Sequence, residues 1–322
     1  MKKVMKILGI VVLCIIICII ALVAVLMVKN YFDSKTPLLP DDYYTGFKSD
    51  SEREKKYSGK GDFTVSSVTY KSDNKSIGNF RIWYPSEMEN GTKTYPLIVV
   101  ANGSNTPALI YQPYFERLAS WGFVVIGNDD KQTGTGDTTS ETLNYMLSLN
   151  KDTNSIFCGR IDEDKIGIAG YSQGGAAAIR AVTEFENSNK YKAIFTGSAS
   201  YALLARNMGW EYDISKVTIP YFMTGGTGAS DDSGKYGDNE FAGVAPLFSL
   251  KDNYNGMPGD VEKIRARVTG AEHFEMQLRT DGYMTAWMLY HLYEDEEAAK
   301  VFVGDEAEIL NNANWQDIEK NK

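Results

Sequence analysis

A serine in a glycine-flanked turn is the first candidate for chemistry in this sequence. Ser172 is the central residue of GYSQG, residues 170–174, which match the pattern G-x-S-x-G. A short apolar run, 166–169, precedes the motif, and a run of glycine and alanine, 174–178, ends it. This order predicts a nucleophile elbow, in which a buried strand turns sharply into a helix and exposes the serine hydroxyl, rather than an ordinary strand-to-helix turn. So tight a turn needs small flanking residues.

A serine hydroxyl is a poor nucleophile unless a base takes its proton, and histidine has a suitable pKa for that near neutral pH. The chain has two histidines. His291 lies on the apolar face of a predicted helix with Trp287 and Met288, which indicates a core residue. His273 lies on a glycine-containing loop after the last predicted strand, 264–268. We therefore predict that His273 is the base rather than a solvated loop residue.

The third group of such a site is a carboxylate that orients the imidazole. Where an elbow of this kind carries the serine, the acid follows the serine and precedes the histidine in the chain. The loop after the predicted strand 220–223 contains Asp231 and Asp232. We favour Asp231, because it is the first carboxylate that the loop reaches. Asp232 is the alternative acid, and Glu262 is a more distant alternative. The interpretation that gives these carboxylates no function is that the loop is acidic only because it is solvated.

Acyl transfer also requires hydrogen-bond donors for the oxyanion that develops during the reaction. One expected donor is the backbone N–H of Gln173, which follows the serine at the start of a helix. The second is expected from the loop after the predicted strand 96–101, where Gly103 permits a tight turn. We assign the backbone N–H of Ser104 as this second donor, with that of Asn105 as the alternative.

The remaining candidate residues point to structure rather than chemistry. Asp129 and Asp130 precede the serine, so we expect them to end a strand and to satisfy turn backbone groups. Cys158 has no partnered histidine and is expected to be a buried small residue. Asp238 and Glu240 lie near the acidic loop, but their spacing fits no known calcium loop, so no metal site is predicted. There is also no G-x-G-x-x-G or Walker loop, and a nucleotide site has no support.

The first residues predict an uncleaved membrane anchor. Residues 7–28 contain no charge, and about 22 apolar residues form about 33 Å of helix, enough to cross a bilayer core of roughly 30 Å. A secretory signal peptide is the alternative, but its apolar region would be only about 7–15 residues long. Lysines 2, 3 and 6 precede the span, so residues 1–6 are expected in the cytoplasm and the bulk of the chain outside.

The charge of the chain argues against some classes of binding partner, and its cysteine content argues against an internal disulfide. Four of the 33 basic residues lie at positions 2, 3, 6 and 29, and no acidic residue precedes Asp33. The rest of the chain therefore has 29 basic and 42 acidic residues, a formal net charge of −13. Nucleic acid and acidic polymers are poor partners for such a domain. Two of the three cysteines, Cys14 and Cys18, lie in the predicted span, so an internal disulfide is not available to the outer part.

Strands and helices alternate along the chain after a polar stretch. The pattern predicts a membrane span at 7–28, a linker at 29–60, one α/β domain at 61–305 and a tail at 306–322. Antiparallel strands are expected first and a mainly parallel sheet after them, with helices on both faces. The predicted strands are 63–70, 79–84, 96–101, 123–126, 166–169, 191–195, 220–223 and 264–268, and the predicted helices besides the elbow helix are 114–121, 138–149 and 281–293.

Three segments together resemble the α/β-hydrolase superfamily, in its dienelactone-hydrolase-like and cutinase- or polyester-hydrolase-like branch. They read RLASWGFVVIGND (117–129), IDEDKIGIAGYSQGGAAA (161–178) and GAEH (270–273), and the resemblance extends roughly over 63–303. It implies an α/β-hydrolase fold and a serine hydrolase without a metal or an organic cofactor. It also implies a triad of Ser172, Asp231 and His273, and a place for Tyr171 in the wall of the acyl site.

The expected activity is therefore hydrolysis of a carboxylic ester through an acyl-enzyme, on the outer side of a membrane. A small acyl or acetyl ester is favoured on the ground of this location. Two alternatives stay open: a peptidase or amidase that uses the same triad, and a catalytically inactive hydrolase fold that binds partners at the cell surface.

Overall fold

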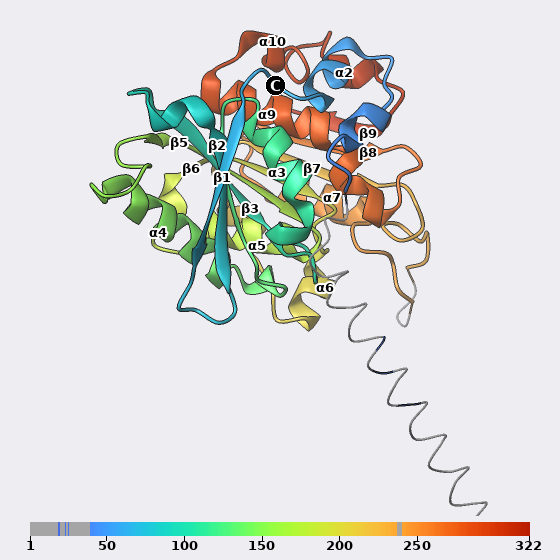
Figure 1. The fold of residues 1–322 in the computed structure, drawn as a ribbon. Coiled ribbons are helices and arrows are strands. Elements are labelled where there is room, and N and C mark those ends of the chain that lie inside the picture. The colour runs from blue at the N-terminus through green and yellow to red at the C-terminus, as the bar shows by residue number, and fades with distance from the viewer. Residues whose placement is uncertain (1–18, 20–22, 24, 26–38, 237–239) are drawn as a thin grey trace, which may run out of the picture.

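The computed structural model describes residues 19, 23, 25, 39–236 and 240–322, and shows a sheet enclosed by helices (Figure 1). The order of the nine strands in this described sheet is β1-β2-β4-β3-β5-β6-β7-β8-β9. In chain order the strands are β1 (Val65–Lys71), β2 (Asn79–Pro85), β3 (Tyr95–Ala101), β4 (Val124–Asn128), β5 (Ile161–Tyr171), β6 (Tyr191–Gly197), β7 (Tyr221–Gly226), β8 (Lys263–Val268) and β9 (Trp315–Lys320).

The strand directions give a mixed, mainly parallel sheet. Strands β3 to β8 pair in parallel with one another. The β1–β2 and β2–β4 pairs are antiparallel, as is the β8–β9 pair at the other edge. The predicted α/β architecture is therefore confirmed, including its antiparallel start. Each strand and helix named from the sequence is present, with ends shifted by a few residues.

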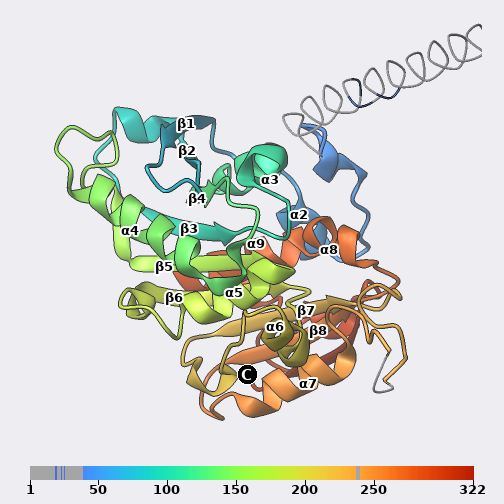
Figure 2. The ribbon, with the colours of Figure 1, turned by 90° about the horizontal axis from the view of Figure 1, so that it is seen from below.

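Helices cover both faces of the sheet. One layer contains α2, α3, α9 and α10, and the other contains α4, α5, α6 and α7. Figure 2 shows α7 beside β7 and β8. The α-helices are α2 (Glu52–Ser58), α3 (Gln112–Ala119), α4 (Asp137–Lys151), α5 (Gln173–Ala181), α6 (Ala202–Asn207), α7 (Leu247–Gly256), α8 (Met276–Arg279), α9 (Asp281–Tyr293) and α10 (Glu296–Ala299). The 3-10 helices are η1 (Tyr43–Gly46), η2 (Ser86–Glu89), η3 (Ala108–Tyr111), η4 (Thr133–Thr135), η5 (Ser188–Lys190), η6 (Ile214–Lys216), η7 (His273–Glu275) and η8 (Glu308–Asn311).

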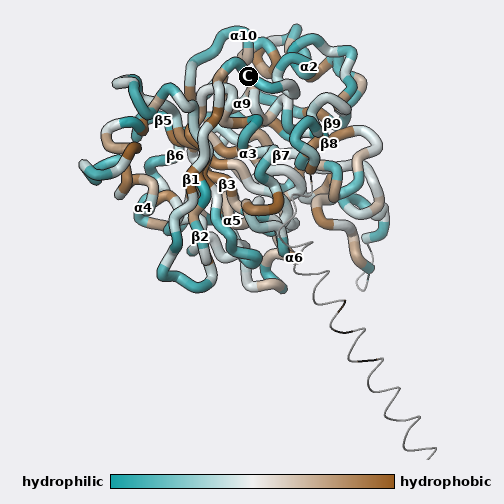
Figure 3. Tube along the Cα trace, viewed as in Figure 1, coloured by the Kyte–Doolittle hydropathy of each residue, from teal (hydrophilic) through white to brown (hydrophobic). Residues whose placement is uncertain are grey.

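The core follows the alternation of side chains along the central strands. In β3, Leu97 and Val99 pack into the layer of α4 and α5, whereas Ile98 and Val100 pack into the layer of α3 and α9. Successive side chains of a strand point to opposite faces, so a strand covered on both faces is apolar throughout. Figure 3 shows the hydrophobic residues concentrated along these strands, with hydrophilic segments toward the periphery.

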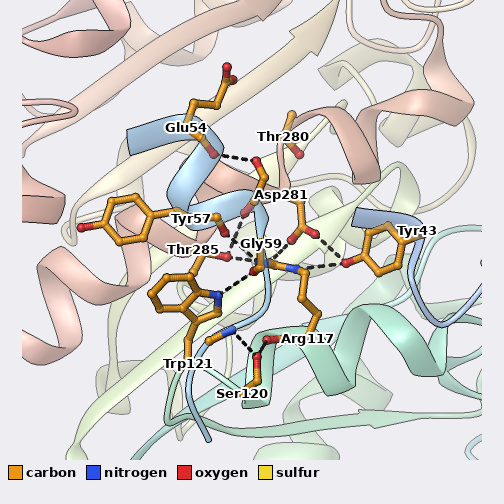
Figure 4. A network of polar contacts seen from close by, with 12 residues as sticks. Tyr43, Glu54, Tyr57, Gly59, Arg117, Ser120, Trp121, Thr280, Asp281 and Thr285 are labelled. Carbon is orange, nitrogen blue, oxygen red and sulfur yellow. Dashed lines mark hydrogen bonds and ion pairs between the residues drawn. The ribbon is translucent and has the colours of Figure 1, made fainter. Parts of the chain in front are cut away.

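The structure differs from the predicted linker, 29–60, over the part of it that is described. From residue 43 onward the chain forms η1 and α2, which pack against the domain. Tyr43 donates a hydrogen bond to Asp281 Oδ2 at 2.6 Å, and Arg117 forms an ion pair with Asp281 Oδ1 (Figure 4). Arg117 Nη1 also donates to the carbonyl groups of Tyr57 and Gly59, at 2.8 and 3.0 Å. Tyr57 of the same segment is buried in the core of the domain, so the segment combines polar contacts with apolar packing.

The predicted tail, 306–322, also belongs to the domain. Its strand β9 pairs with β8 and completes one edge of the sheet. The buried Glu54 of α2 accepts hydrogen bonds from Asn312 at 2.8 Å and from the indole of Trp315 at 2.5 Å. Helix α2 and the segment that leads into β9 are therefore in direct contact.

The predicted membrane span, 7–28, lies outside the described residues except for Ile19, Val23 and Val25. In the part of the chain that the structure describes, no helix has both the length and the apolar character needed to cross a membrane.

Candidate active site

Ser172 lies in a sharp turn between β5 and α5. Its backbone has φ 58° and ψ −124°, a conformation that non-glycine residues rarely adopt and that is costly unless the surroundings hold it. A Cβ on Gly170 would collide with the carbonyl of Gly174, and one on Gly174 would collide with the carbonyl of Ala101. The two glycines of the motif are therefore required for α5 to approach β3 and β5 this closely, and the turn has the shape of a nucleophile elbow.

The loops after β7 and β8 bring a carboxylate and an imidazole to this serine. His273, the first residue of η7, has its Nε2 3.0 Å from Ser172 Oγ. Its Nδ1 is 2.6 Å from Asp231 Oδ1. Asp231 is completely buried and His273 is 8% exposed, so solvent competes little for these contacts. The structure thus brings together the three side chains that the sequence singled out.

The second carboxylate oxygen of Asp231 is held from two sides. The N–H of Gly226 donates to Oδ2 at 2.6 Å, and the hydroxyl of Ser198 donates to the same oxygen. Sequence reasoning missed Ser198. The signal available for it was weak, because Ser198 follows strand β6 in an unremarkable run of small residues, GSAS.

The alternative acids have other partners. Asp232 Oδ2 lies 2.7 Å from Arg267 Nη1 and accepts the N–H of Leu247 at 3.2 Å, so it connects its loop to β8 and α7. Glu262 accepts a hydrogen bond from Tyr290 at 3.3 Å, and burial raises its pKa. Within the described residues, neither carboxylate is hydrogen-bonded to His273.

Tyr171 contacts the imidazole instead of only lining a wall. Its ring stacks on that of His273, with ring centres 5.1 Å apart and ring planes 25° from parallel. Its hydroxyl donates to the backbone carbonyl of His273. Burial raises the pKa of Tyr171 well above its ordinary value, so the phenol stays a neutral donor at physiological pH. Tyr171 therefore holds both the ring and the backbone of His273.

The expected oxyanion donors lie on two segments that are both hydrogen-bonded to the same backbone carbonyl, that of Lys131. The backbone N–H of Asn105 and the side-chain amide of Gln173 both donate to the carbonyl of Lys131, at 3.0 and 2.9 Å. Asn105 is thus engaged elsewhere. The N–H of Ser104 has no hydrogen-bond partner among the residues that the structure describes. Of the two alternatives from the sequence, Ser104 is the one whose N–H is available to a ligand.

The loop after β4 supports these segments. Asn102 donates to the carbonyls of Asn128 and Asp130, at 2.7 and 3.0 Å, and accepts at its own carbonyl from Thr133 at 2.6 Å. The carboxylate of Asp130 accepts from Thr138, and Asp129 forms an ion pair with Arg81 at 2.7 Å. Both aspartates therefore have structural partners, in keeping with the roles expected from the sequence.

A small cavity of about 20 Å³, partly open to solvent, lies beside the elbow. Its wall includes Gly103 of the oxyanion loop and the backbone of β3 and β5 near Gly170. Aromatic side chains supply much of the remaining wall, and they are Tyr111, Tyr114, Phe115, Tyr171 and Phe195. The cavity is suited to a small apolar group more than to a charged one.

The other residues considered from the sequence lie away from this arrangement. His291 has its ring 4.1 Å from that of Trp287, and burial lowers its pKa to about 3, so it is neutral at physiological pH. Cys158 is half-buried. Asp238 lies outside the described residues, and within the described ranges no three His, Cys, Asp or Glu side chains gather as metal ligands would.

The fold and this site define a class of protein. A mainly parallel sheet with helices on both faces carries a serine in an elbow after one central strand. The carboxylate and the imidazole follow on loops at the carboxyl ends of later strands, in the chain order of α/β-hydrolases. The same constellation is the arrangement that activates a serine for acyl transfer.

Comparison with known proteins gives the family. Residues 50–320 match the family model described as "PETase: PET hydrolase-like". The chain is 26% identical to "Cutinase est2" of Thermobifida alba over 228 aligned residues. This alignment covers 68% of this chain and 66% of that protein. The chain is 26% identical over 238 residues to a cutinase of Thermobifida fusca, covering 71% and 69%. It is 24% identical over 204 residues to "Bis(hydroxyethyl) terephthalate hydrolase" of Streptomyces coelicolor, covering 62% and 56%.

The chain therefore belongs to the PET hydrolase-like family and is a carboxylic ester hydrolase of the α/β-hydrolase class. The match begins within the predicted linker and ends within the predicted tail, which agrees with the packing of both segments onto the domain.

Proposed function

We propose that this protein is a membrane-anchored, extracytoplasmic serine esterase that cleaves short acyl esters through Ser172, His273 and Asp231. The observation that carries the proposal is the continuous contact from Ser172 Oγ to His273 Nε2, at 3.0 Å, and from His273 Nδ1 to Asp231 Oδ1, at 2.6 Å. Both distances fall in the range at which a proton is transferred or an imidazole is oriented.

In the proposed mechanism, Ser172 Oγ attacks the ester carbonyl while His273 Nε2 takes its proton. The buried carboxylate of Asp231 holds the imidazole and stabilises the imidazolium that forms. The N–H groups of Gln173 and Ser104 bind the oxyanion of the tetrahedral intermediate. His273 then gives the proton to the departing alcohol, and the acyl group stays on the serine. Water attacks this acyl-enzyme with His273 as base, which releases the acid and restores the site.

The preference for a short acyl group is supported by the cavity beside the elbow. Aromatic side chains limit its space, and Gly103 and Tyr171 connect it to the oxyanion loop and the elbow. An acetyl or similarly small group fits such a space. The relatives are named for cutin and for a terephthalate ester, so esters on polymers are a further substrate type that agrees with the family.

The proposed location is supported by the sequence. Residues 7–28 are uncharged and follow three lysines, which favours a span with residues 1–6 in the cytoplasm and the catalytic domain outside. Residues 29–38 would connect the span to the domain, which begins near η1. Exchanging the lysines across the span and finding the domain still outside would contradict the charge argument.

A chain-length series tests the proposed substrate class. The full chain in detergent is assayed with p-nitrophenyl acetate, butyrate, octanoate and laurate, with Ser172→Ala as the inactive control. We expect kcat/KM to be highest for acetate or butyrate and to fall with longer chains. A maximum at laurate would contradict the short-acyl preference. Hydrolysis of a peptide p-nitroanilide at a rate comparable with acetate would favour the peptidase alternative.

A further inference from the structure

Ser198 is a buried residue that follows β6 and lies outside the proposed triad. Its side chain has no exposure to solvent. A buried hydroxyl is costly unless it is hydrogen-bonded. Among the residues that the structure describes, the hydroxyl of Ser198 has one side-chain partner, the Oδ2 atom of Asp231. An ionised carboxylate only accepts hydrogen bonds, so Ser198 is the donor.

This contact completes the set of donors around the carboxylate of Asp231. Oδ1 faces His273 Nδ1 at 2.6 Å, while Oδ2 accepts from Ser198 and from the N–H of Gly226 at 2.6 Å. A Cβ on Gly226 would lie 2.9 Å from Oδ2, so the glycine is what permits this approach of the backbone. Two donors on one oxygen fix the plane of the carboxylate and leave the other oxygen for the imidazole.

The backbone of Ser198 is held in an unfavourable conformation at this point. Its φ is 49°, in the left-handed region that non-glycine residues rarely occupy. Its N–H donates to the carbonyl of Thr224 in β7 at 2.9 Å, and the carbonyl of the preceding Gly197 accepts from the N–H of Ser172 at 3.0 Å. The residue is thus fixed between the elbow and the strand that leads to Asp231. Strained residues of this kind persist where the surroundings determine them, often at functional sites.

We propose that Ser198 is a positioning residue, which orients the carboxylate of Asp231 so that its other oxygen meets His273. This inference rests on the proposed function of the three residues. Ser198 acts through Asp231. Loss of its hydroxyl leaves Oδ2 with a single donor and lets the carboxylate turn away from the imidazole. The effect should fall on the chemical step, and binding of the ester should stay unchanged.

The test compares Ser198→Ala with a matched variant in the same segment, Ser200→Ala. Ser200 is also buried, and its side chain has no hydrogen bond to the three residues. For the full chain in detergent, kcat and KM are measured with p-nitrophenyl acetate, together with the rate of fluorophosphonate labelling. We expect Ser198→Ala to lower kcat and the labelling rate about tenfold, with KM changed less than twofold. Ser200→Ala should stay within twofold of the wild type in all three.

A second variant separates the hydroxyl from the backbone. Ser198→Gly removes the hydroxyl and relieves the positive φ, so it also serves if the alanine variant does not fold. A tenfold loss of kcat in Ser198→Gly, with an unchanged melting temperature, supports the positioning role. A kcat within twofold of the wild type in either variant overturns it. Wild-type protein without labelling or turnover would refute the proposed function itself, whereas an active wild type with unchanged Ser198 variants refutes this inference alone.

Discussion

Asp231 and Asp232 are adjacent in the chain and have opposite surroundings. The carboxylate of Asp231 is fully buried and faces His273, while that of Asp232 pairs with Arg267 and caps the start of α7. The choice between them could be argued from the sequence only by the order in which the loop reaches them. The burial of one and the ion pair of the other depend on β8, which is distant in sequence.

This difference predicts separate effects for two substitutions of the same kind. Asp231→Asn should lower kcat by about 10³–10⁴-fold, because the amide cannot hold the imidazole in the required tautomer. Asp232→Asn should leave kcat within about fivefold and lower the free energy of unfolding by about 1–3 kcal/mol, since it weakens the contact with Arg267. Ester kinetics and urea unfolding of both variants check this. A larger loss of kcat in Asp232→Asn would contradict the assignment.

At the scale of elements, the loops after β7 and β8 are joined by the side chain of Glu272. Its carboxylate accepts from the N–H groups of Ala229 and Ser230, at 3.2 and 3.0 Å, and from the hydroxyl of Ser230. The same hydroxyl accepts from the N–H of His273 at 2.8 Å. The hydrogen bonds from Ser230 lower the pKa of Glu272, so the carboxylate is ionised at neutral pH. Glu272 thus connects the loop that carries the acid to the loop that carries the base.

Glu272→Gln should therefore lower kcat without a matching change in KM. The amide nitrogen cannot accept from Ser230, so the two loops lose part of their connection and the contact between Asp231 and His273 loosens. We expect a loss of roughly threefold to tenfold in kcat. Glu306→Gln, at an exposed turn away from the site, is the control. Equal kcat in the two variants would show that the loops keep their geometry without Glu272.

Much of the sheet could be predicted, because its strands are continuous apolar runs that a strand covered on both faces requires. The elbow was equally clear, since few sequences place a serine between glycines after such a strand. The segments missed include α2, α7 and β9, and also the short helices α6, α8 and α10. Glu54 of α2 lies in the stretch predicted to be a linker, yet it is buried against Trp315 and Asn312. Ser198 and Glu272 were missed because their roles depend on contacts between loops.

At the scale of the whole molecule, α9 connects the two ends of the domain to the sheet. Asp281 at its start binds Arg117 and Tyr43, and Trp287 in its middle donates to the carbonyl of Ile194 in β6 at 3.0 Å. Near its end, His291 is half-buried against aromatic rings, and its Nε2 atom has no partner among the described residues. A histidine in such a place resists protonation.

His291 should make the folded protein sensitive to acid. Burial lowers its pKa from 6.5 to about 3, so below pH 6.5 the unfolded chain binds a proton that the folded chain does not. The free energy of unfolding therefore falls with pH below about 6.5, by about 2 kcal/mol from this residue between pH 7 and pH 5. His291→Phe keeps an aromatic ring and should reduce the difference in stability between these two pH values by that amount. An unchanged difference in urea unfolding would contradict the shielding of His291.

In the proposed mechanism Ser172 is an activated nucleophile supported by His273. The most direct test of this mechanism is fluorophosphonate labelling of the full chain, followed by peptide mapping with mass spectrometry. We expect an adduct on Ser172 that is absent in Ser172→Ala and strongly reduced in His273→Ala. No adduct on folded wild-type protein, or an adduct that persists at the wild-type rate in His273→Ala, would contradict the mechanism.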